Sequence, residues 1–322
     1  MKSFAIFFFL SQFLFGDVNL KIATYNVENL FDLQRSGHEY PEYIPNSNSK
    51  WNKQNYKVKL KNIARVIAEI DADIVALQEI ESNQALQDLR YTLKQKGLYY
   101  QYFKIANLKN TTTKVAILSK IPINYTREIK VAYSYKYRNI LEVKVRINNQ
   151  DIYLFINHWK SKAGPESMRI FSAKKLLARV KDIGLDKNII LIGDFNSDYA
   201  ENIKFIRNRK HNDTNGRTGI NDILKPFYNL WYDTSIEKRY TYIYRGKKEA
   251  LDNILVSKPL LNKDGVSYIN HTISSYKPHY LFKGKNIYRW QTRGKKTRIH
   301  KGKGYSDHLP VIAEFLVKGD TN

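Results

Sequence analysis

The chain has 322 residues, of which 43% are hydrophobic and 13% aromatic. This composition supplies a large core and excludes an intrinsically disordered chain. Lys and Arg total 54 against 30 Asp and Glu, and the formal net charge of +24 favours a polyanion as partner. The charge alone would equally suit a membrane surface or a cell-wall polyanion. The sequence has no cysteine, which excludes a disulfide-stapled scaffold and thiolate chemistry.

Residues 1–16 are typical of an export signal. Lys2 gives a positive start, a mostly apolar stretch runs from Phe4 to Phe15, and Gly16 is a small residue at which cleavage would fall. An N-terminal membrane anchor is the alternative, but about a dozen apolar residues fall short of the roughly 20 that span a bilayer. We therefore expect export to the periplasm or the extracellular space, with residues 17–322 as a single catalytic domain.

The mature chain predicts a mixed α/β domain without repeats or a linker rich in Pro, Gly and Ser. After the signal, apolar alternation and helical spacing define the elements. In chain order, we expect a strand at 20–26, a surface loop at 34–54, a helix at 56–70, a strand at 74–77, a helix at 84–96, strands at 115–118, 142–146 and 153–156, a helix at 167–181, and strands at 188–192, 240–244, 251–256 and 309–317. The strands at 240–244 and 251–256 are expected to pair around the polar turn between them.

Residues 266–306 form a basic segment ahead of the last strand. It holds ten Lys or Arg and no Asp or Glu, interleaved with seven aromatic residues. We interpret it as an inserted loop, because cations and aromatic rings in alternation suit a phosphate backbone and stacked bases. Lys295, Lys296 and Arg298 are its candidate substrate-binding residues.

Six short polar clusters lie at or near the ends of apolar strands, where side chains project into a common cleft. They are Thr24–Asn26, Gln78–Glu79, Asn157–His158, Gly193–Asn196, Leu251–Asn253 and Ser306–His308. Together they hold three Asp, one Glu, two His and several Asn, which are the groups of a hard-cation site with acid–base partners. Each cluster alone is more typical of a turn or helix cap, so the inference depends on the ordered set.

These clusters lie within motifs that resemble the endonuclease/exonuclease/phosphatase superfamily, the deoxyribonuclease-I-like proteins. The motifs are TYNVENL (24–30), LQEIE (77–81), INHWKSK (156–162), GDFNSD (193–198), ALDNILVS (250–257) and YSDHLPV (305–311). The resemblance implies a four-layer α/β sandwich, in which two packed mixed β-sheets are flanked by helices. It also implies that the clusters meet at one edge of the sandwich.

The resemblance further implies a metal site. Asn26, Glu79 and Asp307 would bind a divalent cation, with Glu79 as the principal ligand. Oxygen ligands favour Mg²⁺, with Mn²⁺ or Ca²⁺ as alternatives.

The remaining clusters would act on the phosphate. Asp194 and Asn196 would orient the attacking water and the scissile phosphate, while His158 and His308 would flank that phosphate. Asp252 would hydrogen-bond to His308 and fix its tautomer. Which histidine is the base stays open, and in related enzymes Asp194 is a rival for that role. Arg138 precedes a strand where related proteins often place a phosphate-contacting arginine, and a solvated surface arginine is the alternative.

The sequence therefore predicts a secreted, metal-dependent phosphodiesterase. The superfamily acts on DNA, abasic sites, inositol phosphates and sphingomyelin, so the substrate must be inferred from the surface. The cationic surface favours a nonspecific endonuclease that binds double-stranded DNA as a monomer, without an obligate protein partner. A sphingomyelinase-like phospholipid phosphodiesterase and a cationic binding protein with an inactive fold are the alternatives.

Overall fold

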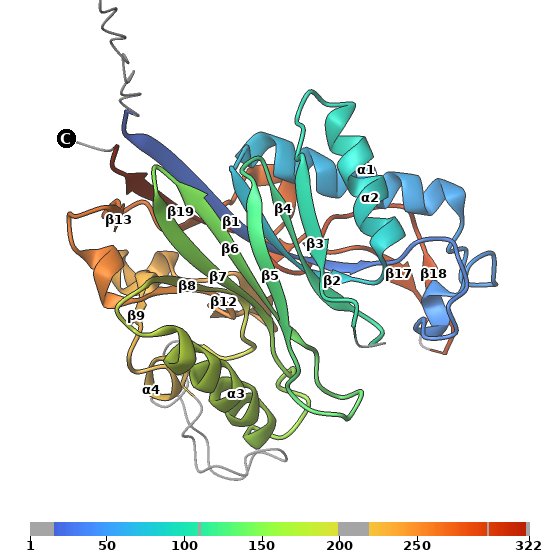
Figure 1. The fold of residues 1–322 in the computed structure, drawn as a ribbon. Coiled ribbons are helices and arrows are strands. Elements are labelled where there is room, and N and C mark those ends of the chain that lie inside the picture. Colours follow the sequence, from blue (N-terminus) through green and yellow to red (C-terminus); the bar gives the residue numbers. More distant parts are fainter. Residues whose placement is uncertain (1–15, 109–110, 199–218, 295, 320–322) are drawn as a thin grey trace, which may run out of the picture.

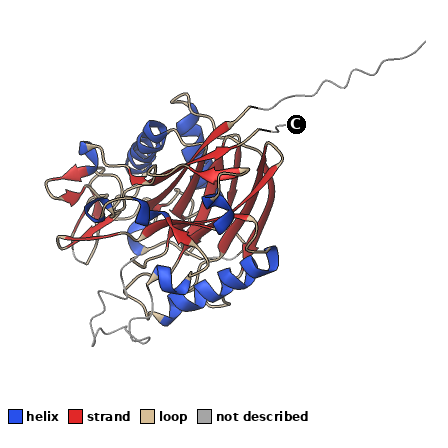
Figure 2. Ribbon diagram, turned by 90° about the vertical axis from the view of Figure 1, so that its left-hand side faces the viewer, coloured by secondary structure: helices blue, strands red, loops and turns tan. Residues whose placement is uncertain are grey.

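The computed structural model describes residues 16–108, 111–198, 219–294 and 296–319. Two large mixed sheets pack face to face, with α1 (Lys53–Ile70) and α2 (Asn83–Lys94) outside one sheet and α3 (Ser167–Ile183) outside the other (Figures 1 and 2). This arrangement is the four-layer sandwich that the motifs imply, so the expected fold is confirmed. Within the described ranges, no helix is both long and apolar enough to cross a bilayer.

The first sheet has the order β13-β19-β1-β2-β4-β3, and β14 also pairs with β19. Its strands are β1 (Val18–Leu30), β2 (Ile74–Ile80), β3 (Tyr102–Ile105), β4 (Lys114–Ser119), β13 (Val266–Tyr268), β14 (Ser274–Ser275) and β19 (Val311–Val317). β1 and β2 run parallel, and the other pairs are antiparallel. The first and last strands of the domain therefore lie side by side.

The second sheet has the order β5-β6-β7-β8-β12-β9, with β7 and β8 parallel. Its strands are β5 (Ile123–Ile129), β6 (Ile140–Ile147), β7 (Gln150–His158), β8 (Asn188–Asp194), β9 (Tyr228–Asn229) and β12 (Asp252–Val256). Three small hairpins pair β10 (Tyr242–Tyr244) with β11 (Lys247–Glu249), β15 (Phe282–Lys283) with β16 (Asn286–Ile287), and β17 (Thr292–Arg293) with β18 (Ile299–His300). The short helices are α4 (Ile220–Ile223) and 3₁₀ turns at Pro41–Tyr43, Leu230–Asp233, Ile236–Lys238, Lys258–Leu261 and His279–Leu281.

The apolar core has three layers: one between the two sheets, one beneath α1 and α2, and one beneath α3. Three layers form because the central strands are apolar on both faces. In β8, Ile190 and Ile192 pack between the sheets, whereas Ile189 and Leu191 pack in the cluster beneath α3. Strand side chains alternate between faces, so a strand covered on both sides appears in sequence as a continuous apolar run. This run stabilises the sandwich and fixes the register of the strand ends, where the polar clusters lie.

One expected strand pairing in the later part of the chain was wrong. The segment 240–244 does not pair with 251–256, because β10 pairs with β11 while β12 pairs with β8 and β9. The apolar strand β12 is buried between β8 and β9, and the polar residues before it form the separate β10–β11 hairpin. The strands β3 and β5 were not expected; β5 has no buried residue to give a clear apolar period.

The basic segment is also not an inserted loop with free aromatic rings. β13 and β14 extend the first sheet, and Trp290 and Tyr305 are buried in the core cluster that includes α1. Lys59 on α1 donates to the Tyr305 carbonyl at 2.7 Å. All seven aromatic residues pack on the protein, either buried or partly buried: Tyr268, Tyr276, Tyr280, Phe282, Tyr288, Trp290 and Tyr305. The buried rings, such as Trp290, therefore cannot stack on bases, and base stacking by the partly buried rings stays a prediction.

Candidate active site

Strand register brings the six polar clusters to one edge of the sandwich. In the second sheet, His158 lies opposite Asp194 on the neighbouring strand, and Asp194 lies opposite Asp252. In the first sheet, Asn26 lies opposite Gln78, and His308 precedes the strand that runs antiparallel to β1. The ends of β1, β2, β7 and β8 thus meet the starts of β12 and β19.

A β-bulge directs Glu79 into this edge. The register of β2 with both neighbours shifts between Gln78 and Ile80, and Glu79 has a φ of 66°. A bulge re-aims a side chain that regular alternation would send elsewhere, and positive φ in a non-glycine residue is characteristic of functional sites. The Glu79 carboxylate accepts from the Asn26 amide nitrogen at 3.3 Å and from the Asn29 backbone N–H at 2.9 Å.

The Gly-Asp-Phe-Asn turn holds Asp194 in place. Gly193 has a φ of 133°, and a Cβ there would lie 2.2 Å from the Asn157 carbonyl oxygen, so only glycine permits the close approach of β7 and β8. Asn196 donates its backbone N–H to Asp194 Oδ1 at 2.8 Å and its amide to the Trp159 carbonyl at 3.1 Å. Among the described residues, 195–198 form no helix, so Asp194 and Asn196 do not cap one there.

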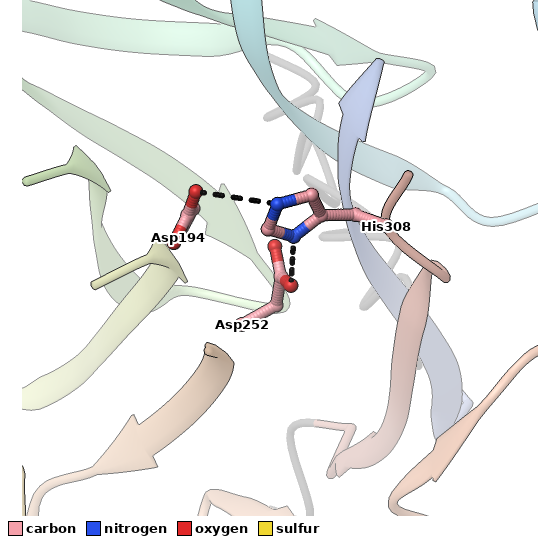
Figure 3. A group of neighbouring side chains, drawn as sticks. All are labelled: Asp194, Asp252 and His308. Carbon is pink, nitrogen blue, oxygen red and sulfur yellow. Dashed lines mark hydrogen bonds and ion pairs between the residues drawn. The ribbon is translucent and has the colours of Figure 1, made fainter. Parts of the chain in front are cut away.

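Asp194 and His308 are central to the site (Figure 3). Asp194 Oδ2 lies 3.0 Å from the Asn26 amide nitrogen, 3.5 Å from His158 Nε2 and 3.9 Å from His308 Nε2. On the other side of the His308 ring, Nδ1 lies 2.7 Å from Asp252 Oδ2. Because Nδ1 is bonded to the buried Asp252, Nε2 is the nitrogen that faces the cleft.

Burial and neighbouring charge separate the pKa values of these groups. Burial would lower the pKa of His308, but the Asp252 and Asp194 carboxylates hold it well above its usual value. Burial lowers the pKa of His158 well below its usual value, with help from Arg138 and His308. Burial raises the pKa of Asp194 to about 7. Neighbouring groups with pKa values displaced in opposite directions are typical of acid–base sites.

The cleft also contains a donor set that fits a hard cation. Glu79 and Asp307 both line it, and burial followed by the charge of Asp307 raises the pKa of Glu79. Two carboxylates that repel each other in a buried cleft are a natural site for a divalent cation with oxygen ligands. Asn26 faces the carboxylates with its amide nitrogen, while its oxygen accepts from the Glu28 N–H, so its role as a ligand stays a prediction.

A second group satisfies metal-site distances within the described residues. Ligand atoms of Asp194, Asp252 and His308 lie within 4.8 Å of one another. The Asp252–His308 hydrogen bond already uses two of these ligand atoms, and a metal there would have to replace it. The Asp194–Asp252–His308 group is therefore compatible with a metal ion as well as with acid–base work, and the expected binding of the cation by Glu79 and Asp307 stays a prediction.

The cleft has a volume of about 700 Å³, and seven of the expected site residues line it: Glu79, Arg138, His158, Asp194, Asn196, Asp307 and His308. Arg138 is half-buried and donates to Thr113 Oγ1 at 3.3 Å. A second groove of about 640 Å³ is lined by Lys296 and Arg298 and shares Asn29 and Tyr40 with the cleft. Lys295 lies outside the described residues. The tip of the basic segment thus borders a surface continuous with the catalytic edge.

Sequence reasoning missed the link between the edge and the basic segment. Glu28 accepts from the Arg289 guanidinium at 2.8 Å and from the Trp290 backbone N–H at 2.9 Å, and Arg289 also lies 3.2 Å from Asp307. Glu28 and Arg289 are 261 positions apart, and neither belongs to an apolar period. Nothing in the spacing of the sequence signals this pair.

The fold and the strand-end cluster define a deoxyribonuclease-I-like protein. The family model described as Endonuclease/Exonuclease/phosphatase family matches residues 21–317, and the chain belongs to that family. Members of the family are metal-dependent phosphoesterases. No curated protein matches the chain at the sequence level.

Several solved structures share the fold. D. rerio TDP2 complexed with single strand DNA product is 16% identical, with a TM-score of 0.59, and the match covers 92% of this chain and 98% of that one. An endonuclease/exonuclease/phosphatase family protein from Bacteroides thetaiotaomicron is 14% identical over 95% and 100%, with a TM-score of 0.59. A family protein from Leptotrichia buccalis C-1013-b is 17% identical over 91% and 98%, with a TM-score of 0.56. At this identity the likeness concerns the fold.

Proposed function

We propose that the chain is an exported, divalent-metal-dependent endonuclease that hydrolyses DNA without sequence preference. The observation that carries the proposal is the meeting of Glu79, His158, Asp194, His308 and Asp307 in one cleft. Phosphodiester hydrolysis requires an oriented water, neutralisation of charge on the phosphate oxygens and a proton for the leaving oxygen. The cleft offers a side chain for each requirement.

The protein groups divide these tasks by position. A divalent cation held by Glu79 and Asp307 would act as a Lewis acid on the phosphate oxygens. His308, held through Nδ1 by Asp252, presents Nε2 for donation to a phosphate or leaving oxygen. Asp194 lies between the two histidine rings, where its carboxylate would accept the proton of the attacking water.

DNA is the proposed substrate because cations flank the cleft on two sides. Arg138 lines the cleft itself, and Lys296 and Arg298 line the groove that adjoins it. Contacts to a phosphate backbone give affinity without reading sequence. The structural relative D. rerio TDP2, which is complexed with a single-strand DNA product, supports a nucleic-acid substrate. We propose double-stranded DNA as the substrate and a monomer as the active form.

Export is proposed from residues 1–16. The first strand begins at Val18, so cleavage after Gly16 would leave β1 complete. Removal of Lys2 with the signal changes the formal charge from +24 to +23 (24 − 1), which keeps the mature protein strongly cationic. Immunoblotting of cell fractions for the shortened chain tests this part separately.

The test of function is a substrate panel. Purified residues 17–322 are incubated with supercoiled plasmid, single-stranded RNA and sphingomyelin vesicles, each with Mg²⁺ or with EDTA. We expect nicked and linear plasmid with Mg²⁺ only, and no phosphocholine release. Phosphocholine release without plasmid cleavage would establish the phospholipid alternative, and inactivity on all three substrates would favour a binding protein.

A further inference from the structure

Two tyrosines project into solvent beside the cleft. Tyr133 is 90% exposed and Tyr135 is 77% exposed. Both lie in the loop between β5 and β6, which leads to Arg138 at the cleft wall. Single exposed apolar side chains are common on protein surfaces, but two exposed rings two residues apart at an active site are a candidate binding surface.

Three cations gather on the same side of the cleft. Lys136 and Arg138 belong to this loop, and Lys160 follows the end of β7 two residues after His158. Leu141 at the start of β6 pairs with Ile156 near the end of β7, so the loop before β6 and Lys160 after β7 lie at the same end of the second sheet. Burial, followed by the charges of Arg138 and Lys136, lowers the pKa of Lys160. Within the ranges that the structure describes, none of the three forms an ion pair with a carboxylate. Their mutual repulsion would be relieved by an anionic ligand.

We propose that Tyr133 and Tyr135, together with Lys136 and Lys160, bind a single-stranded segment of nucleic acid that extends from the scissile phosphate past Arg138. This inference rests on the proposed function and adds a substrate feature to it, namely unpaired nucleotides beside the cleavage position. Unpaired bases stack on aromatic rings, and neighbouring cations contact the connecting phosphates.

The geometry of Tyr133 suits stacking from one side. The Lys130 ammonium lies 3.3 Å from the centroid of the Tyr133 ring, so a cation covers one face. A base can then stack only on the opposite face. The cation also holds the ring in position, which reduces the entropy lost on binding.

A membrane is the competing ligand for an exposed aromatic loop. Insertion at a lipid interface favours adjacent large apolar side chains, whereas here Ser134 separates the tyrosines and Lys136 follows them. The cations also lie close to the cleft, since Arg138 lines it and Lys160 follows the cleft residue His158 by two positions. These features favour a chain of phosphates that leads into the cleft.

The experiment measures binding in EDTA, so that no cleavage occurs. The Tyr133→Ala/Tyr135→Ala double variant is compared with the wild type by fluorescence anisotropy. The probes are a labelled blunt DNA duplex and the same duplex with a single-stranded extension of about six nucleotides. We expect Kd for the extended probe to rise about 10-fold per tyrosine removed, and Kd for the blunt duplex to change less than about 2-fold. The Tyr133→Phe/Tyr135→Phe variant should bind like the wild type, because the rings remain.

Tyr91→Ala is the matched control, since Tyr91 is 64% exposed on the outer helix α2. Equal loss of affinity for both probes, or no loss for either, would overturn the single-strand assignment. Loss of binding to phosphatidylserine vesicles with unchanged binding to the extended probe would assign the loop to a membrane instead. If the wild type neither binds nor cleaves any DNA probe, the proposed function itself is wrong. The wild-type measurements alone therefore separate this outcome from a failure of the single-strand assignment.

Discussion

The catalytic edge and the basic segment 266–306 both combine charged and aromatic side chains, but burial acts differently in each. At the edge, burial encloses ionisable groups such as Asp194 and His308 and displaces their pKa values. In the segment, the aromatic side chains, including Trp290, are buried or partly buried, whereas most of the Lys and Arg side chains are exposed. The edge is therefore suited to chemistry, whereas the segment supplies packing and long-range charge.

The largest expected effect concerns the histidines of the edge. His158→Ala and His308→Ala should each lower kcat by roughly 10²- to 10⁴-fold, the usual contribution of positioned proton transfer. Asp252→Asn should resemble the His308 variant, because it removes the group that orients the ring. Steady-state kinetics on a DNA substrate checks this, with circular dichroism to verify folding. His271→Ala is the control, since that side chain is 79% exposed. Near-normal turnover would remove the residue from the site.

Trp290 tests whether the basic segment is part of the core. Trp290→Ala should lower the free energy of unfolding by about 3–5 kcal/mol, the cost of truncating a buried aromatic side chain. Tyr135→Ala should change it by no more than about 0.5 kcal/mol, because that ring is exposed. Urea titration measures both. Equal stability of the Trp290 variant and the wild type would contradict the packing of the segment.

The surface cations of the segment should contribute mainly to the affinity for DNA. Replacement of Lys296, Arg298 and Lys301 by alanine should flatten the slope of log K against log salt by about three. The same change should raise KM more than it lowers kcat, since distant backbone contacts are equal in the ground and transition states. Binding titrations at several salt concentrations measure the slope. An unchanged slope in the folded variant would favour attachment to a wall or membrane as the role of the segment.

A smaller effect is expected from His300, which joins the segment to the 34–54 loop. Trp290 donates its indole N–H to His300 Nδ1 at 2.7 Å, so Nε2 carries the proton toward the Glu42 carbonyl at 2.8 Å. Burial lowers the pKa of His300. As pH falls, the unfolded chain therefore takes up a second proton on this ring at a higher pH than the folded protein does. The free energy of unfolding should consequently fall as pH drops below about 6.5.

His300→Gln isolates this contribution from the other histidines. The variant should lose less stability than the wild type between about pH 7 and pH 5, measured by urea titration at each pH. Parallel curves for the two proteins would show that His300 is not held neutral in the folded state.

The layers and the strand ends could be predicted because they depend on local pattern. The apolar runs before Glu79 and Asp194 indicated buried strands, and their polar ends indicated an edge. The bulge at Glu79 could not be predicted, because one extra residue in a strand leaves no mark in composition.

The role of the basic segment could not be predicted for a different reason. A ring beside a lysine has the same sequence pattern whether the ring is buried and the lysine reaches solvent, or both are exposed. Trp290 belongs to the first kind, and Tyr135 belongs to the second. Only contacts across long sequence separations, such as Glu28 with Arg289, distinguish them.

The central claim is that DNA hydrolysis requires a divalent metal ion bound through Glu79, and nicking of supercoiled plasmid tests it most directly. Wild-type protein and the Glu79→Ala variant are titrated with Mg²⁺ and then treated with excess EDTA. We expect wild-type nicking to saturate with Mg²⁺ and to stop in EDTA, and the variant to lose about 10³-fold in rate while remaining folded. Full cleavage by the wild type in excess EDTA, or by the variant at ordinary Mg²⁺, would contradict the account.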